Sequence, residues 1–380
     1  MEDLTSILQL INTDGVGPIT FYKLIDMYGS AKEAIKNLPK RYNVFAKSTA
    51  QHEIELAKAK NIKIIAYKDN EYPDLLRELE DAPPILYAKG NIELLKHPLA
   101  VSIVGARNAS INGRKTISKI SYDLTNNDIL VVSGMARGID TAAHRGAMHA
   151  KDQIGPTIAV LGTGVDVIYP KENKELYKQI VSQGLIISEF PLGSEPQSAN
   201  FPRRNRIVAG LAIGTLVGEA SINSGSLITA RLALEQGKDI FAIPGTPNDS
   251  RSSGPNKLIK EGAVLVEDAN DIINIISNTN THKIRELKCY KQENLFTNSL
   301  DKSEKNVNIP ETAKTKKTAN IDLIDYITVD GVDIDDLIRA SNSDAALVSV
   351  ELLNLELSGK IVRKVGNKVA LASKSSGRKG

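Results

Sequence analysis

Between residues 99 and about 275, short apolar segments alternate with turns and helical stretches in a repeating pattern. The apolar segments are nearly continuous in branched aliphatic residues, which is typical of strands covered on both faces and hence of a parallel sheet. We predict strands at residues 99–104, 128–132, 157–161, 184–187, 211–217, 239–243 and 263–266. Helices are predicted between them, including residues 113–126, 139–148, 173–183 and 226–236. This alternation predicts an α/β fold with an extended Rossmann-like, doubly wound parallel sheet.

A small helical domain is predicted in residues 1–60. Leu4, Ile7 and Leu8 recur at helical spacing, and the turn at residues 14–18 interrupts the pattern before it resumes. This arrangement predicts a helix-hairpin-helix or SAM-like domain, whose Gly15-Val16-Gly17 turn either places backbone amides on a nucleic-acid phosphate or simply connects two helices. Two apolar runs, residues 62–67 and 85–87, are predicted as edge strands that lead into the main sheet, so the Rossmann-like domain covers residues 61–276.

The C-terminal part predicts a linker and a second domain. Residues 277–319 are rich in Asn, Thr, Lys and Glu, which predicts a flexible linker. Residues 320–372 predict helices at 321–327, 332–340 and 344–357 and a hairpin within 360–371, which is typical of a winged helix. Winged helices either enter the DNA major groove or dock proteins, and Asp333, Asp335 and Asp336 disfavour tight DNA contact, so both roles stay open. Residues 373–380 form a basic tail.

The composition excludes several classes of protein. The one cysteine, Cys289, excludes an internal disulfide and a multi-cysteine metal site, and it fits a reducing cytoplasm. There is no apolar run long enough for a membrane span, and the first residues lack the basic and apolar segments of a secretory signal. The histidines are scattered without metal-ligand spacing. We therefore expect a cytoplasmic protein with no metal and no cofactor.

Three arginines are concentrated in the segment Phe201-Pro202-Arg203-Arg204-Asn205-Arg206, and no Asp or Glu occurs between residues 199 and 216. We predict a loop whose positive charge meets solvent, a distant acid or a bound anion. Three predicted strand-to-helix turns also carry glycines, hydroxyls or arginines, namely Gly105-Ala106-Arg107, Gly134-Met135-Ala136-Arg137-Gly138 and Ser224-Gly225-Ser226. Because the carboxyl ends of parallel strands lie along one edge, where phosphate ligands bind, we expect these turns to lie together at that edge.

The turns favour phosphate binding over catalysis. The first turn has one glycine, Gly105, and places Arg107 where a dinucleotide should lie close, so neither a dinucleotide fingerprint nor a Walker loop is present. No nucleophile sits beside a general base at a recognisable spacing. Guanidinium groups and backbone amides suit phosphate oxygens, Phe201 can stack on a base, and Asn205 can bond a base edge. Alternatively, Phe201 caps a helix and buries its ring. Aromatic stacking requires unpaired bases, which favours single-stranded DNA or RNA.

In order and spacing, six motifs resemble those of the DNA-processing protein A family, DprA or Smf. They are residues 102–107, 133–140, 188–191, 201–207, 224–230 and 242–245. The resemblance covers nearly the whole chain, and it implies a helical N-terminal domain, an extended Rossmann-like core and a C-terminal winged helix. It also implies a non-enzymatic, dimeric protein that binds single-stranded DNA, protects incoming DNA and loads the RecA recombinase onto it during natural transformation.

The resemblance also assigns residues by position. It places Arg107, Arg137 and residues 203–206 in a DNA pocket and adds Lys171 as a basic contact. The predicted DNA-binding residues are Gly105, Arg107, Ser110, Gly134, Arg137, Gly138, Lys171, Phe201, Arg203, Arg204, Asn205, Arg206, Ser224, Gly225, Ser226 and Thr229. A dimer interface is implied at Asn256, Ile259 and Leu265. The chain departs from the family pattern in an apparent lengthening near residues 150–155 and in its long linker.

Two other functions stay open. Enzymes that cleave nucleoside monophosphates also bind phosphate at the edge of a Rossmann-like sheet, but their Pro-Gly-Gly-x-Gly-Thr loop is absent from Gly225-Ser226-Leu227-Ile228-Thr229. The chain can also act as an adaptor whose winged helix recruits a partner.

Overall fold

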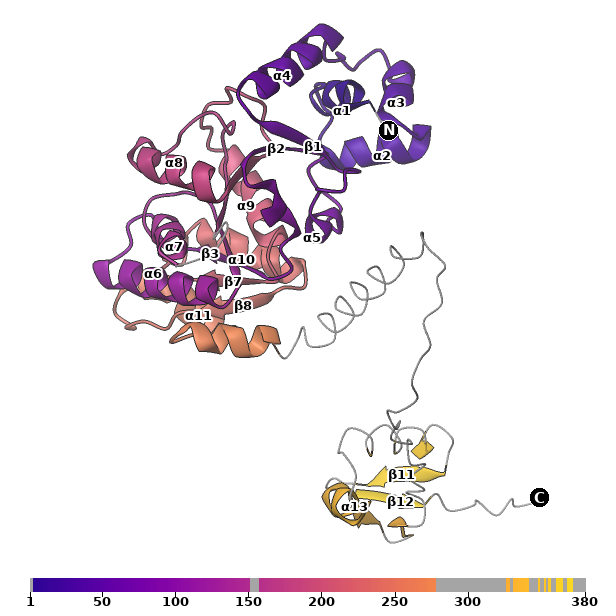
Figure 1. The fold of residues 1–380 in the computed structure, drawn as a ribbon, viewed down its shortest axis with the longest axis vertical. Coiled ribbons are helices and arrows are strands. Elements are labelled where there is room, and N and C mark those ends of the chain that lie inside the picture. Colours follow the sequence, from indigo (N-terminus) through magenta and orange to yellow (C-terminus); the bar gives the residue numbers. More distant parts are fainter. Residues whose placement is uncertain are drawn as a thin grey trace, which may run out of the picture. The chain divides into compact units, whose positions relative to one another are not determined.

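The computed structural model divides the chain into two compact units, Met1–Asn298 and Ser299–Gly380 (Figure 1). Of the first unit it describes residues 3–150 and 157–277. Of the second it describes residues 326–328, 331–341, 348, 352, 355–356, 360–364 and 368–371. The predicted linker, apart from Ser277, lies outside the described residues, as do the basic tail and the lengthened segment from residue 151. The predicted division into domains stays a prediction.

Four helices form the N-terminal part of the first unit, and the predicted arrangement of helix, glycine turn and helix is confirmed. Gly17 precedes the second helix in an extended conformation, and Pro18 occupies the first turn, where its missing N–H costs nothing. Leu8 and Phe21 are fully buried and share a hydrophobic core with the strand residue Ile65. The helices are α1 (Leu4–Ile11), α2 (Pro18–Tyr28), α3 (Ala31–Asn37) and α4 (Lys47–Ala59).

A nine-stranded sheet forms the centre of the first unit, in the order β1-β2-β6-β5-β4-β3-β7-β8-β9. The strands from β6 to β9 in that order pair in parallel, as predicted. At the other end β2 pairs antiparallel with both β1 and β6. β1 is therefore an edge strand, as predicted, whereas β2 lies inside the sheet and the prediction of an edge strand is wrong for it. The strands are β1 (Lys63–Ala66), β2 (Ile85–Gly90), β3 (Ala100–Val104), β4 (Leu130–Ser133), β5 (Thr157–Val160), β6 (Leu185–Ser188), β7 (Gly214–Val217), β8 (Asp239–Ala242) and β9 (Val264–Leu265).

The sheet is doubly wound about β3, which confirms the predicted fold class. From β3 the chain continues through β4, β5 and β6 on one side, and through β7, β8 and β9 on the other. The order of the strands reverses between β3 and β7, and such a switch point leaves a crevice outside the carboxyl ends of the strands. The strand predicted at residues 211–217 is shorter than expected because the preceding helix runs to Gly210 and Leu211 caps it.

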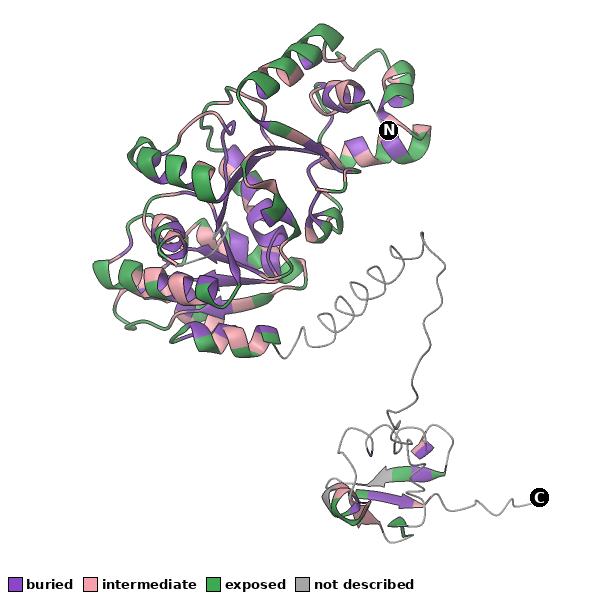
Figure 2. Cartoon of the chain, in the orientation of Figure 1, coloured by how far each residue is buried: buried purple, intermediate pink, exposed green. Residues whose placement is uncertain are grey.

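Helices cover both faces of the parallel strands. On one face Ile117 of α6 packs in a core with Val101, and on the other Ile207 of α9 packs in a core with Val104. Figure 2 shows the result, in which the central strands are buried and the helices are exposed on their outer faces. The helices and 3-10 turns are α5 (Asp74–Arg77), η1 (Ile92–Lys96), α6 (Ile111–Asn126), α7 (Ile139–Met148), η2 (Lys171–Asn173), α8 (Lys174–Gln183), α9 (Asn200–Gly210), α10 (Ser226–Glu235), η3 (Ser250–Ser252) and α11 (Ser253–Lys260).

The second unit contains a three-stranded antiparallel sheet in the order β10-β12-β11 and a helix. The predicted hairpin is confirmed, but the helix predicted at residues 332–340 begins with a short strand that pairs with the hairpin. Val348, Leu352 and Leu355 are buried in its core. Most of the two helices predicted at 321–327 and 344–357 lies outside the described residues, as does the Gly-Asn turn. The elements are β10 (Val332–Asp333), α13 (Ile334–Ser341), β11 (Ile361–Lys364) and β12 (Lys368–Leu371).

His144 in α7 is a fully buried histidine. Its Nδ1 lies 2.8 Å from Thr157 Oγ1, and that hydroxyl donates to the carbonyl oxygen of Val131 at 2.7 Å. The hydroxyl proton is therefore used, so His144 donates from Nδ1, while the buried Nε2 has no hydrogen-bond partner among the described residues. Burial lowers the pKa of His144 to about 3, and the nearby Arg204 also lowers it.

We expect acid to destabilise the protein through His144. In the unfolded chain His144 binds a proton near its ordinary pKa of 6.5, whereas in the folded chain it binds one only near pH 3. The free energy of unfolding therefore falls as the pH drops through this window. Between pH 6.5 and about 4.5 the loss from His144 is roughly 2–3 kcal/mol. Urea unfolding at these two pH values should show a smaller loss, by that amount, in His144→Gln than in the wild type. The same pH dependence in both proteins would contradict this assignment.

Candidate nucleic-acid interface

A groove of about 650 Å³ opens at the carboxyl edge of the sheet, where the order of the strands reverses. The turn after β3 and the turn between β7 and α10 line it, together with the first turns of α9. The groove brings together ten of the predicted DNA-binding residues: Gly105, Arg107, Gly134, Phe201, Arg204, Asn205, Ser224, Gly225, Ser226 and Thr229. The strand-end turns therefore meet at one edge, as expected, and their role in binding DNA stays a prediction.

The arginine-rich segment is a helix, α9, so the predicted loop is wrong. Pro202 is tolerated in the first turn of the helix. Because an α-helix repeats every 3.6 residues, positions spaced by three, four and seven share one face. That face lines the groove with Phe201, Arg204, Asn205 and Val208. Arg203 and Arg206 are instead directed to Glu189, so the helix divides the arginines between two environments.

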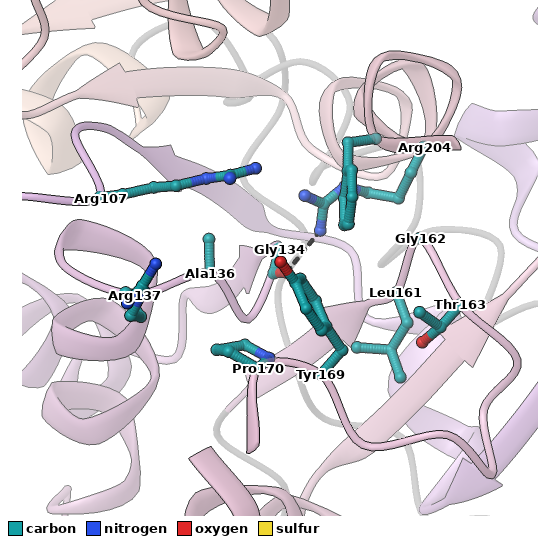
Figure 3. A pocket seen from close by; sticks show the side chains of 11 residues that line it. Arg107, Gly134, Ala136, Arg137, Leu161, Gly162, Thr163, Tyr169, Pro170 and Arg204 are labelled. Carbon is teal, nitrogen blue, oxygen red and sulfur yellow. Dashed lines mark hydrogen bonds between the residues drawn. The ribbon is translucent and has the colours of Figure 1, made fainter. Parts of the chain in front are cut away.

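Arg204 is buried beneath the groove. Its Nη1 donates to the carbonyl oxygens of Gly134, at 2.6 Å, and Val160, at 2.5 Å, so it connects α9 to the ends of β4 and β5. Figure 3 shows the bond to Gly134 and places Arg107 and Tyr169 around it. A Cβ at Gly134 would overlap the guanidinium group, so this position requires glycine. Burial lowers the pKa of Arg204, and the nearby Asp140 opposes that change.

Arg206 is paired with the protein's own acids. Its side chain is 8% exposed, its Nη2 donates to Glu189 Oε2 at 2.5 Å, and its Nε lies 3.3 Å from Asp81. The more exposed Arg203 lies 3.8 Å from the same carboxylate. Burial raises the pKa of Glu189, and Arg206 opposes that rise. Of the three alternatives for the positive charge, solvent, a distant acid or a bound anion, the distant acid holds for Arg206, because the fold brings two carboxylates from other segments.

Arg107, Phe201 and Tyr169 form a stack in the groove. The guanidinium carbon of Arg107 lies 5.5 Å from the centre of the Phe201 ring, and the Phe201 and Tyr169 rings are 5.6 Å apart at 37°. A Cβ at Gly162 would lie 2.9 Å from the Phe201 ring, so the glycine allows this close approach. Arg107 and Tyr169 are exposed and Phe201 is half-buried, so the alternative of a fully buried ring is wrong. The stack offers a cation and aromatic surface to a ligand.

Gly138 holds two of the strand-end turns close together. It has a φ of +79°, which favours glycine. A Cβ at this position would overlap the carbonyl oxygen of Ala106 in the neighbouring turn. The turns after β3 and β4 therefore approach closely, which brings Arg107 and Arg137 to the same end of the sheet.

Other predicted residues lie beside the groove. Ser110 caps α6, and its hydroxyl and backbone N–H both donate to Glu219, at 2.5 and 2.6 Å, so the protein's own carboxylate already occupies this serine. Arg137 lies 3.7 Å from Glu172, with both side chains exposed. Lys171 is exposed and directly follows Pro170, which lines a smaller adjoining pocket with Arg107 and Arg137.

Sequence reasoning missed several residues that line the groove. Tyr169 is one, although an aromatic residue beside Pro170 and Lys171 was an available signal. Ser221 and Arg251 also line the groove. Arg251 comes from η3 and pairs with Asp249 at 2.8 Å. No local pattern places it here, because the loop after β8 returns to the groove only in the folded chain.

The groove carries more positive than negative charge. Its lining includes Arg107, Arg204 and Arg251 but one carboxylate, Asp140. Burial raises the pKa of Asp140, while Arg204 and the Ala136 N–H favour its ionised form. Within residues 3–150 and 157–277 and the described part of the second unit, no group of three or more His, Cys, Asp or Glu side chains could hold a metal. The same residues include no helix long and apolar enough to cross a membrane.

We expect Arg206→Ala to destabilise the protein because it leaves the buried Glu189 without its main partner. Removing one partner of a buried ion pair costs about 3–5 kcal/mol, whereas Arg203→Ala, at a 54% exposed side chain, should cost below about 1 kcal/mol. Urea unfolding of the two variants measures the difference. If Arg206→Ala is as stable as Arg203→Ala and only DNA binding is lost, Arg206 is a DNA contact and the structural role is wrong.

Comparisons with known proteins support the resemblance. A family model described as DNA recombination-mediator protein A matches residues 63–277, and models of a DprA-like N-terminal HHH domain and a DprA winged helix domain match residues 1–63 and 310–367. DNA processing protein DprA of Streptococcus pneumoniae is 49% identical over 205 residues, which cover 54% of this chain and 71% of that protein. DNA processing protein DprA of Bacillus subtilis is 39% identical over 211 residues, which cover 56% and 70%.

Solved structures agree. The S. pneumoniae DprA structure matches with a TM-score of 0.61 and 36% identity, covering 72% of this chain and 98% of that one. DNA processing protein A from Helicobacter pylori, described for its single-stranded DNA binding mode, matches with a TM-score of 0.52 and 30% identity, covering 57% and 96%. The core match spans more than half of the chain, and the predicted family is confirmed: this chain belongs to the DNA-processing protein A family, DprA/Smf.

Proposed function

We propose that this protein binds single-stranded DNA in the groove at the switch point of its sheet, as part of DNA processing in transformation and recombination. The observation that carries the proposal is the stack of Arg107, Phe201 and Tyr169 beside strand-end turns rich in backbone donors. Arginine binds phosphate as a charged fork, and aromatic faces stack on unpaired bases of any sequence. The relative from H. pylori, which binds single-stranded DNA, supports the same ligand here.

The groove suits a single strand better than a duplex. A base can reach Phe201 or Tyr169 only if it is free to leave its partner strand, because stacked base pairs cover their own faces. Ser224 and Ser226, whose hydroxyls lie 2.7 Å apart, and the turn at Gly225 offer further donors on the opposite wall. Backbone and hydroxyl donors bind phosphates without reading sequence. We therefore expect binding with little sequence preference.

We further propose that the bound strand is protected and then passed to RecA in the cytoplasm. This step rests on membership of the DprA/Smf family and on the single cysteine, which fits a reducing compartment. No catalytic turnover is proposed. Ser224 and Ser226 hydrogen-bond to each other, and in the described part of the groove no histidine lies beside them as a base. Release of a free base from AMP would instead support the alternative, a nucleoside monophosphate glycosidase.

We propose that two copies pair through the end of the sheet at β9. Leu265 in β9 is 44% exposed, and β9 is the last strand in the order of the sheet, so no further described strand pairs with its outer edge. Ile259 in α11 is half-buried near this end. Asn256 bonds the backbone N–H and carbonyl of Gly245 at 3.1 and 2.8 Å, which fixes the loop beside α11.

Arg107→Ala and Phe201→Ala should each weaken binding of an oligo-dT, because the first removes a charge and the second a stacking surface. We expect each variant to lose about tenfold or more in affinity for the oligonucleotide, since stacking contributes about 1–3 kcal/mol per base. Affinity falls linearly with salt concentration on logarithmic axes, and Arg107→Ala should make this slope less steep by about 0.7, the contribution of one phosphate contact. Fluorescence anisotropy at several salt concentrations measures both effects. The control is Arg231→Ala, an exposed arginine of α10 outside the groove; equal affinity in all three variants would contradict the proposal.

Leu265→Asp should convert a dimer to a monomer, because a carboxylate replaces an exposed apolar side chain at the proposed contact. Light scattering should give twice the chain mass for the wild type and one chain mass for the variant, with DNA binding in the groove retained. Leu234→Asp, at a 66% exposed position on α10, is the matched control. A wild-type monomer, or a variant that still dimerises, would contradict the proposed interface.

A further inference from the structure

A second groove, of about 630 Å³, lies between α6 and α7 and joins the first at Arg107. Arg107, Asn108 and Gly138 form its upper end at the strand-end turns. Below them it follows the two helices, which are packed side by side in the structure (Figure 1). Its lining contains five cationic side chains and no carboxylate: Arg107, Arg114, Lys115, Arg137 and Arg145. We call this the α6–α7 groove.

The helical spacing places these cations along the same groove. Arg114 and Lys115 are three and four residues after Ile111 on α6, and Arg145 is seven residues after Gly138 at the start of α7. One face of each helix therefore lines the groove, since positions three, four and seven apart share a face. The opposite faces of both helices are committed to the core of the domain.

The cations are exposed and without acidic partners. Arg107, Arg114, Lys115 and Arg145 are all exposed, and in the described residues no Asp or Glu lies within ion-pair distance of any of them. Arg137 has Glu172 at 3.7 Å. Lys119, one turn further along α6, is instead paired with Asp123 at 3.1 Å. A run of unpaired cations in a groove favours an extended polyanion as the ligand.

The two helices approach closely beneath the groove, and its rim is partly apolar. A Cβ at Gly146 would overlap the carbonyl oxygen of Ser118, so the glycine allows α7 to approach the backbone of α6 closely. The side chain of Ile111 is 64% exposed at the rim, although such a residue is usually buried. It can pack against the sugar or base of a nucleotide whose phosphate contacts the neighbouring cations.

We propose that the α6–α7 groove binds the continuation of the DNA strand held by Arg107, Phe201 and Tyr169. The proposal rests on the function proposed above and names the path of the strand: phosphates contact Arg114, Lys115 and Arg145, and Ile111 contacts a sugar or base. From Ile111 to Ser118 the helix rises about 10 Å, which spans about three phosphates at the 3.4 Å spacing of a stacked strand. The groove continues directly from the first, which favours the same single strand over a separate partner.

The test compares two triple variants that each remove three positive charges. Arg114→Gln, Lys115→Gln and Arg145→Gln together change the α6–α7 groove, whereas Lys119→Gln, Lys178→Gln and Arg231→Gln change exposed cations outside both grooves. Binding of a short oligo-dT, long enough only for the first groove, is measured beside binding of a longer one. We expect the first variant to lose about tenfold in affinity for the longer oligonucleotide. Its logarithmic salt slope should become less steep by about 2, and its affinity for the short oligonucleotide should not change. The second variant should resemble the wild type.

Equal affinities for the two triple variants would overturn the proposal, as would an equal loss for short and long oligonucleotides in the first variant. A wild-type protein that binds no oligonucleotide, or an Arg107→Ala variant that binds like the wild type, would instead contradict the proposed function. Loss of binding to an acidic peptide but not to DNA would show that the groove serves a protein partner and would also overturn the proposal.

A crosslink reports the position of the strand directly, even where the change in affinity is small. The chain has one cysteine, Cys289, so Cys289→Ser with Arg145→Cys provides one thiol in the α6–α7 groove. A long oligo-dT with a thiol-reactive group at one end should crosslink to it, and a short one with the same group should not. The reference protein carries Arg231→Cys. Equal crosslinking at the two positions would overturn the proposed path.

Discussion

The buried guanidinium group of Arg204 is the interaction on which the site depends. By donating to the carbonyl oxygens of Gly134 and Val160, it fixes one face of α9 against the ends of two parallel strands. The same face then presents Phe201 above Gly162, where the ring meets Tyr169 and Arg107. Burial lowers the pKa of Arg204, yet the group keeps its charge because carbonyl oxygens and Asp140 surround it. A cation is thus used to build the groove, and another, Arg107, is left free to contact a ligand.

Much of the fold could be predicted because it is encoded in local patterns. The strands and the four central helices follow from continuous apolar runs and helical periodicity, and parallel pairing follows from burial of both faces. The geometry of the site could be predicted only in part. Pro202 and a run of polar residues resembled a loop, and once α9 is a helix its arginines separate onto two faces. The partners of Arg206 are Glu189 and Asp81, which no local pattern connects with it. Ser110, a predicted DNA-binding residue, donates to Glu219, and no local pattern connects these two residues.

The topology explains why so many donors face the same space. The chain winds outward from β3 in two directions, and the first groove lies at this switch point, where the turns after β3 and β7 line it. Gly138 also allows the backbones of the turns after β3 and β4 to lie close together, and from that point the second groove follows α6 and α7. Arg107 lies where the two grooves join. Its position follows from the order of the strands rather than from the composition of any one segment.

The most direct test is to map where a single strand contacts the full chain. Photo-crosslinking of an oligonucleotide that carries 5-iodouracil, followed by mass spectrometry of the peptides, samples the helical N-terminal part, the Rossmann-like sheet and the winged helix in one experiment. Because the label reacts best with stacked aromatic rings, the account predicts that the major crosslinks fall on Phe201 and Tyr169. Crosslinks confined to the glycine turn before α2 or to the C-terminal unit, with none on these two rings, would contradict it.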